Sequence, residues 1–235
     1  ERRVHDEQRF LIKASEELGT SLDLGLTLGD IARLVVPHLA DWCTIDLLMD
    51  TGLLERQTVA HVDPAKVALA WELWQRVPPK PEDPHGVYNV VRTRRAEMFE
   101  DIPDALLVAT IPDPEILAIC RSLGLRSSMS VPLIVRDRVL GALSLVSTGD
   151  GRRYGARDLT FAEEFARRIA IAVDNAQLFG AMKAARTAAE VIAADVIEQS
   201  RDVQAALLAM RAERDAAMTR LEASERAREA LGGTP

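Results

Sequence analysis

The sequence is poor in cysteine, has no surplus of basic residues and has no long hydrophobic run, and each shortage excludes a class of protein. Two cysteines cannot form a disulfide framework, and so low a count fits a reducing compartment. The longest apolar run, residues 139–146, is far short of the ~20 residues that cross a bilayer, and the charged first residues do not form a signal peptide. We therefore expect a cytoplasmic protein that does not associate with membranes.

Charge and missing motifs exclude further functions. The chain has 29 basic and 36 acidic residues, a formal net charge of −7 and no basic stripe, so nucleic acid is not an expected partner. It has no Gly-rich phosphate loop, no His and Cys set at metal-binding spacing, no Gly-x-Ser-x-Gly motif and no histidine-kinase boxes. We expect neither an enzyme nor a metal protein. Because the chain begins without Met, we take it as a piece of a longer protein.

Hydrophobic periodicity predicts a globular part that contains both helices and strands, the α+β class of α/β proteins. Helical spacing is found at residues 10–18, 28–39, 63–74 and 113–124, and strand-like runs are found at residues 42–49, 53–60, 127–135 and 138–147. Tight turns are expected at residues 50–52 and around Asp137. Residues 78–86 contain four prolines, which deny the backbone its donors, and are predicted to be a loop.

The last third of the chain is predicted to be one helix. From Asp158 to Leu231 only Gly180 interrupts the pattern, and at about 1.5 Å per residue such a helix would be on the order of 110 Å long. No compact domain requires that length, so its second half must leave the globule. Apolar or small residues recur there at alternating spacings of four and three. This seam comprises Leu178, Met182, Ala185, Ala189, Ile192, Val196, polar Gln199, Val203, Ala206 and Met210.

Such a heptad seam requires a partner helix. Beyond it the better positions become Leu207, Met218 and Leu221, which implies a register shift at residues 206–210. The alternative is a single solvated helix supported by Glu–Arg pairs. We favour a parallel two-stranded coiled coil, because lone helices in water are marginally stable.

Five segments of the globular part, in this order, resemble GAF domains. They are Ala-Asp-Trp-Cys-Thr-Ile-Asp-Leu at 40–47, Ala-His-Val-Asp-Pro-Ala-Lys at 60–66, Leu-Gly-Leu-Arg-Ser-Ser-Met-Ser-Val-Pro-Leu at 123–133, Arg-Val-Leu-Gly-Ala-Leu-Ser-Leu-Val at 138–146, and Gly-Arg-Arg-Tyr at 151–154 leading to Ala-Val-Asp-Asn-Ala-Gln-Leu at 172–178. The resemblance covers about residues 8–180. It is to bacterial GAF domains that precede histidine kinase or metal-dependent serine phosphatase modules.

The resemblance implies a GAF/PAS-like central antiparallel sheet flanked by helices, with a ligand pocket on one face and a helical layer on the other. It also implies a homodimer whose interface is formed by the first and last helices, in agreement with the seam. We expect a GAF sensory domain at residues 1–180, which includes the N-terminal helix, and a coiled-coil signalling helix at residues 181–235.

The resemblance leaves the ligand open, because GAF domains bind cyclic nucleotides, bilins, haem or other small molecules, or bind nothing. Cys120 is followed by Arg121 rather than His and is out of place for a bilin thiol. The cyclic-nucleotide signature is not recognisable, and of the possible axial haem ligands only His85 is placed to overlook a pocket. We therefore name no cofactor. The residues expected to frame a small-molecule site are Trp71, Trp74, His85, Tyr88, Ser128 and Ser130.

These observations predict a sensory or regulatory domain that relays the state of a ligand or partner through a dimeric coiled coil to a downstream kinase or phosphatase module. One alternative is a dimerisation spacer whose pocket is filled by its own side chains. The other is a domain similar to free methionine sulfoxide reductases, with Cys120 near the catalytic position. In that family the resolving cysteine would fall near Tyr88, and Cys43 lies on a different strand.

Overall fold

The computed structural model describes residues 2–20, 24–149 and 152–231 of the chain. These residues form two compact units, Glu1–Phe179 and Gly180–Pro235. Helix α7, Ala156–Leu231, contributes to both units. The helix predicted from Asp158 onward is therefore confirmed.

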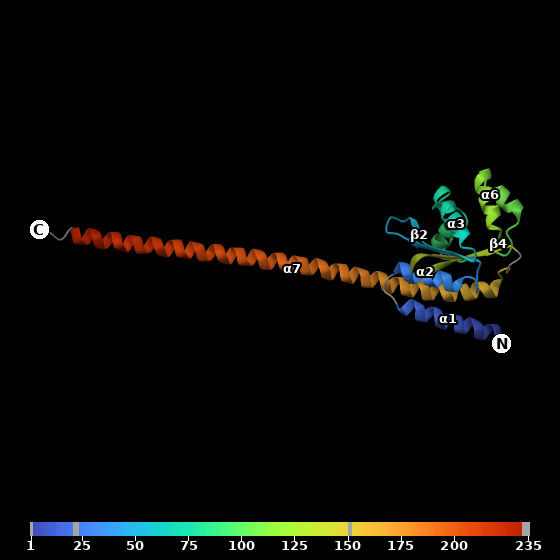
Figure 1. Ribbon diagram of the computed structural model, residues 1–235, viewed down its shortest axis with the longest axis horizontal. Helices are drawn as coiled ribbons and strands as arrows, with labels where there is room; N and C mark the ends of the chain where they lie inside the picture. Colours follow the sequence, from blue (N-terminus) through green and yellow to red (C-terminus); the bar gives the residue numbers. More distant parts are fainter. Residues whose placement is uncertain (1, 21–23, 150–151, 232–235) are drawn as a thin grey trace. The chain divides into compact units, whose positions relative to one another are not determined.

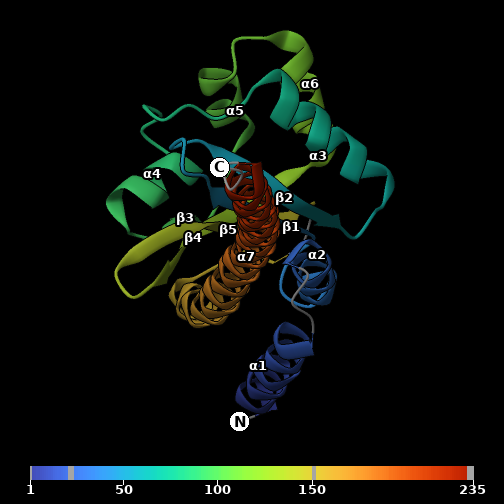
Figure 2. The same cartoon turned by 90° about the vertical axis from the view of Figure 1, so that its left-hand side faces the viewer.

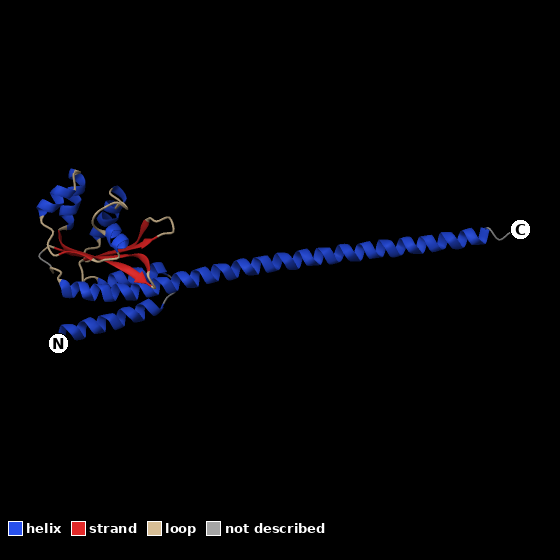
Figure 3. Ribbon diagram, turned by 180° about the vertical axis from the view of Figure 1, so that it is seen from behind, coloured by secondary structure: helices blue, strands red, loops and turns tan. Residues whose placement is uncertain are grey.

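A five-stranded antiparallel sheet forms the centre of the first unit (Figure 3). Its strands are β1 (Trp42–Leu48), β2 (Leu54–His61), β3 (Glu97–Phe99), β4 (Leu125–Val135) and β5 (Arg138–Thr148), in the order β2-β1-β5-β4-β3. The four predicted strands are confirmed. The β4–β5 turn has positive φ angles at Arg136 and Asp137, 48° and 64°, as a two-residue type I′ hairpin requires. Strand β3 was not predicted, because three residues are too few to show alternation.

Helices cover both faces of the sheet (Figures 1 and 2). One face carries α1 (Arg2–Thr20), α2 (Leu24–Val35) and the start of α7, and the other carries α3 (Ala65–Arg76), α4 (Val87–Thr93), α5 (Asp104–Thr110) and α6 (Pro114–Leu123). Helix α2 ends two residues before Pro37, which was expected to interrupt or end it, because the residue before a proline is disfavoured in the helical conformation. The short helices α4 and α5 were not predicted.

The main core lies between the sheet and the α1, α2 and α7 layer. Alternation along β1 and β5 directs Ile45, Leu143 and Leu145 to this side, where all three are fully buried. Helix α7 meets them with Phe165 and Ile169, also fully buried. Full burial of each such side chain contributes about 1.5–3 kcal/mol. This contact therefore dominates the stability of the first unit.

The opposite face holds a smaller core and a buried ion pair. Trp42 packs there with Ala70 of α3 and Leu123 of α6. Asp46, fully buried, accepts hydrogen bonds from Arg56 Nε at 2.8 Å and Nη2 at 3.2 Å. Burial raises the pKa of the Asp46 carboxyl, and the contact with Arg56 acts in the opposite direction. Arg56 is therefore what allows a charged carboxylate to remain inside the sheet layer.

In the second unit every described side chain from Gly180 to Arg226 is exposed. The predicted seam residues among them include Ile192, Val196 and Val203, each more than half exposed. Their apolar surface is therefore unburied in the single chain.

Replacement of Gly141 by Ala tests the close approach of β1 and β5. A Cβ added to Gly141 would overlap the carbonyl oxygen of Asp46 and lie 2.9 Å from Leu47 Cα, both backbone atoms that cannot move aside alone. We expect Gly141→Ala to lower the free energy of unfolding by about 3 kcal/mol. Urea denaturation of the full chain measures it. Gly180→Ala, with no atom within 4 Å of the added Cβ, is the control and should be neutral or stabilising; equal stability of the two variants would contradict the strand geometry.

Replacement of Arg56 by Met tests the buried ion pair. Loss of one partner leaves the other charge unpaired, which costs about 3–5 kcal/mol at neutral pH. The pKa of Asp46 is higher in the folded protein than in the unfolded chain, where it is 3.8. The energetic cost of the unpaired carboxylate is therefore full above the folded-state pKa and disappears as the pH falls to the unfolded-state pKa. The difference in unfolding free energy between wild type and Arg56→Met should thus shrink from pH 7 to pH 4. In the control, Asp46→Asn/Arg56→Met, the difference in unfolding free energy from wild type should be small and independent of pH. A pH-independent loss of stability in Arg56→Met alone would refute the pairing.

Candidate functional site

A row of polar side chains crosses the centre of the sheet on the face covered by α3 and α6. The strand register pairs Glu97 of β3 with Ser130 of β4, Ser130 with Ser144 of β5, and Ser144 with Thr44 of β1. Alternation places these four residues, which we call the polar row, on the same face as Trp42 and opposite Leu143 and Leu145. Thr44 is buried and the other three are half-buried, so polar side chains stand where a helix-covered sheet face would ordinarily be apolar, and this makes the polar row the candidate binding site.

Some of the hydroxyl groups on this face are not used by the fold. Ser130 Oγ and Ser144 Oγ lie 2.8 Å apart and bond to each other. Thr44 Oγ1 is buried and has no hydrogen-bond partner among the described residues. Ser128, two residues along β4 from Ser130, makes no side-chain hydrogen bond to any residue that the structure describes. Since buried polar groups are nearly always satisfied, a hydroxyl such as that of Thr44 marks a place for a polar ligand atom or a water.

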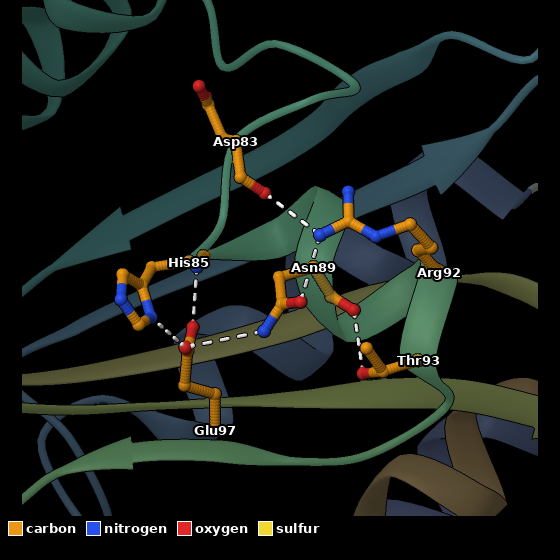
Figure 4. A network of polar contacts seen from close by, with 7 residues as sticks. Asp83, His85, Asn89, Arg92, Thr93 and Glu97 are labelled. Atoms are coloured by element: carbon orange, nitrogen blue, oxygen red, sulfur yellow. Dashed lines mark hydrogen bonds and ion pairs between the residues drawn. The ribbon is translucent and has the colours of Figure 1, made fainter.

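Glu97 anchors the proline-rich loop at the edge of the polar row (Figure 4). One carboxylate oxygen lies 2.6 Å from His85 Nδ1 and 3.4 Å from Asn89 Nδ2, and the other accepts from the backbone N–H of Gly86. Arg92 donates to the carbonyl oxygens of Pro81, at 2.7 Å, and Asp83, at 3.1 Å. The loop is therefore held by charge-assisted hydrogen bonds from both α4 and β3.

The six predicted site residues lie on this side of the sheet but do not converge on one point. Trp71 and Trp74 belong to α3 and are partly buried. Trp74 stacks on Arg56, whose Cζ is 4.0 Å from the ring centroid. Tyr88 of α4 is buried, and its hydroxyl accepts from Leu54 N at 2.9 Å. Both contacts tie a helix to β2.

The other three predicted residues lie nearer the middle and the β3 edge. Ser128 and Ser130 are on β4, and Ser130 belongs to the polar row. His85 is in the loop, and its ring packs edge-on against Phe99 of β3 with centroids 5.7 Å apart. Thus Ser128, Ser130 and His85 lie along β3 and β4, whereas Trp74 and Tyr88 connect to β2.

Sequence analysis did not identify Thr44, Ser144 or Glu97. A signal was present, because Thr44 lies between apolar Cys43 and Ile45 and Ser144 lies between Leu143 and Leu145. Only the strand register shows that they are neighbours of Ser130.

At the end of the sheet, two further donors on this face have no hydrogen-bond partner among the residues that the structure describes. Trp42 and His61 are directly paired across β1 and β2. His61 Nδ1 accepts from the Asp63 N–H at 2.8 Å, so the proton of the neutral ring is on Nε2, which is buried and unbonded, as is Trp42 Nε1. Burial, reinforced by Lys66, lowers the pKa of His61, which keeps the ring neutral at pH 7. His61 is thus a buried neutral donor at the end of the sheet.

The two cysteines lie on opposite sides of the sheet. Cys43 is in the core with α7, and Cys120 is on α6. Burial raises the pKa of both thiols, and Asp46 adds to the effect on Cys43. Both are therefore protonated at neutral pH, and this arrangement gives no support to a pair of reactive cysteines.

Metal and membrane sites were also sought. Within residues 2–20, 24–149 and 152–231, no three His, Cys, Asp or Glu residues are grouped so as to hold a metal ion. None of the helices described has the length and hydropathy that a bilayer span requires.

Similar proteins support the fold. The family model of the GAF domain matches residues 23–173. The GAF domain of an Acinetobacter phosphoenolpyruvate-protein phosphotransferase has a TM-score of 0.54 and 17% identity, covering 73% of this chain and 94% of its own. That of the Coxiella burnetii phosphoenolpyruvate-protein phosphotransferase has a TM-score of 0.55 and 15% identity, covering 74% and 96%.

The GAF domain region of a putative membrane protein from Geobacter sulfurreducens has a TM-score of 0.50 and 19% identity. The match covers 65% of this chain and 94% of that region. At these identities the likeness concerns the fold alone, and no curated protein matches the sequence. The family model, however, spans well over half of the chain, from the start of α2 to the buried part of α7. With its antiparallel sheet and two helical layers, the chain belongs to the GAF domain family.

Proposed function

We propose that this chain is a sensory module that binds a small molecule at the polar row and relays its presence through a dimeric α7. GAF domains are a family of sensory and regulatory domains. The observation that carries the proposal is the continuity of α7, one helix from Ala156 to Leu231 that both closes the core of the sheet and extends into the second unit. A change at the sheet therefore acts on a helix that continues into the second unit.

The proposed binding site combines the predicted residues with the polar row. Thr44 and Ser128 offer unbonded hydroxyl groups, and Ser130 and Ser144 offer a pair that can reorient. His85 and Glu97 border it through the anchored loop, while Trp71, Trp74 and Tyr88 belong to the helices that cover the same face. A ligand with both donors and acceptors fits hydroxyl groups, which can serve as either.

The proposed relay passes through β5. Ser144 faces the polar row, while its neighbours Leu143 and Leu145 pack in the core that contains Phe165 and Ile169 of α7. Interiors packed at crystal-like density transmit small displacements rather than absorb them. A ligand that shifts β5 would therefore shift α7. The register change at residues 206–210 would be the bistable element that converts this shift into one of two states.

The proposed output is a dimer that regulates a downstream module. The heptad spacing of the seam extends backward to Ile171, which is 46% exposed although it lies in the first unit. Apolar residues so placed on a long helix are stabilised by a second copy of the helix. The proposed partner is therefore a second copy in parallel, the proposed effector is a kinase or phosphatase module, and the proposed compartment is the cytoplasm.

The second candidate, a dimerisation spacer without ligand, is favoured by one observation. Trp74, Tyr88 and His85 already have contacts within the protein, so part of the expected frame is occupied in packing. The unbonded hydroxyl of Thr44 favours the sensor instead.

Native mass spectrometry, compared with the denatured mass, separates the two candidates. We expect a dimer that carries additional non-covalent mass. Thr44→Val/Ser128→Ala should raise the dissociation constant of the ligand about 30-fold, because two hydrogen bonds of about 1 kcal/mol each are lost. The control is Ser122→Ala, which removes the hydroxyl of an exposed residue of α6 and should leave the dissociation constant of the ligand unchanged. A bare dimer from every preparation would favour the spacer.

The seam predicts a sharp contrast between neighbouring residues. Ile192 and Val196 are on the seam and are 64% and 57% exposed, while Val191 and Ile197 are off it and are 65% and 55% exposed. We expect Ile192→Asp/Val196→Asp to raise the dimer dissociation constant at least 100-fold, because two charges per chain would be placed in the interface. Val191→Asp/Ile197→Asp, the matched control, should stay dimeric. Sedimentation equilibrium measures both; equal effects would contradict the seam.

A further inference from the structure

An open cavity lies on the face of the sheet opposite the polar row. Its volume is about 1080 Å³, and it is lined by α1, the end of α2 and the residues that follow it, the sheet and the start of α7. Phe10 of α1, Leu34 of α2 and Phe161 of α7, all half-buried, provide apolar surface inside it, and the buried Met129 and Leu145 lie behind them. The size is that of a ligand site rather than of a packing defect.

The walls of this cavity are predominantly basic. Four of its lining residues are Arg or Lys and two are Asp or Glu, a difference of two positive charges. Arg9 and Lys13 of α1 form no ion pair with any residue in the described part of the chain. Arg153 is paired with Asp101 at 3.3 Å. The cationic charge of Arg9 and Lys13 is thus available to a ligand.

Arg152 is held in place without being neutralised. Its guanidinium donates to the carbonyl oxygens of His38, at 3.1 Å, and Leu39, at 3.3 Å. Carbonyl oxygens fix its position but carry no compensating net charge. Of the two acids, Asp158 accepts from the Gly155 N–H at the start of α7. The cavity therefore has an apolar interior and a fixed cation at its wall.

We propose that this cavity binds an amphipathic carboxylate, an aliphatic chain with one anionic head group. The chain would lie against Phe10, Leu34 and Phe161, and the carboxylate would meet Arg152, Arg9 and Lys13. Guanidinium groups bind carboxylates by charge-assisted hydrogen bonds, which explains the preference for this head group. The site is distinct from the polar row and does not depend on the function proposed for it.

A second copy of the chain is the other possible occupant, because the resemblance to GAF domains implies an interface formed by the first and last helices. A twofold axis pairs one residue with a different residue of the copy, so the sedimentation mass, rather than charge, distinguishes a second copy from a ligand. An anionic amphiphile is complementary to both the apolar surface and the basic wall.

Dodecanoate, below its micelle concentration, is the probe, and titration calorimetry of the full chain is the measurement. We expect one dodecanoate per chain, and at least tenfold weaker binding of dodecyltrimethylammonium, which has the same chain and the opposite charge. Arg9→Gln/Lys13→Gln should weaken dodecanoate binding at least tenfold. Lys183→Gln/Arg201→Gln, which removes equal charge from the second unit, should leave it unchanged. Circular dichroism confirms that both variants fold.

Two further results decide the interpretation. Thr44→Val/Ser128→Ala should bind dodecanoate as wild type does, which separates this site from the polar row. No binding, or equal binding of the two amphiphiles, would overturn the proposal. It would also be overturned if Arg9→Gln/Lys13→Gln altered the sedimentation mass without altering dodecanoate binding, since the surface would then be an interface between copies.

Discussion

The contact on which the first unit depends is the burial of the sheet's apolar face against α7. Phe165, Ile169 and Val173 follow one another at intervals of four residues and are fully buried in one core with β1, β4 and β5. The same helix continues into the second unit, so the sheet cannot be repacked without disturbing α7. Packing against the sheet favours one position of α7. In the proposed relay, a ligand at the sheet would shift α7 and so select between two registers of the seam.

The other face of the sheet is governed by the cost of burying polar groups. Asp46 is tolerated because Arg56 forks around its carboxylate and Trp74 covers the guanidinium. Glu97 is tolerated because three donors from the loop and α4 surround it. The charged groups Asp46 and Glu97 on this face are therefore paired. The buried hydroxyl of Thr44 differs from them, because it has no hydrogen-bond partner among the described residues. A face that is otherwise well satisfied and retains a few free donors is suited to binding a polar molecule.

Much of the fold could be predicted because the long elements carry strong periodicity. Strands β1, β2, β4 and β5 alternate clearly, and the Asp113-Pro114 pair begins α6, with Asp113 capping it as a helix start requires. Helices α4 and α5 and strand β3 have seven residues or fewer and little periodicity, so propensity could not identify them. For the site, the residue types were visible but the partners were not. Stacking of Trp74 on Arg56 and pairing of Ser130 with Ser144 depend on contacts between residues 14 or more apart.

The central claim is that α7 carries a dimeric seam in a defined register, and a cysteine cross-linking scan tests it most directly. Single cysteines at residues 188–199 would be oxidised in a background in which Cys43 and Cys120, both buried, are replaced by Ala. The account predicts strong disulfide formation between copies at 189, 192, 196 and 199, and little at 191, 194 and 197, a period of about 3.5 residues. Uniform cross-linking, or a maximum at 191 and 197, would contradict it.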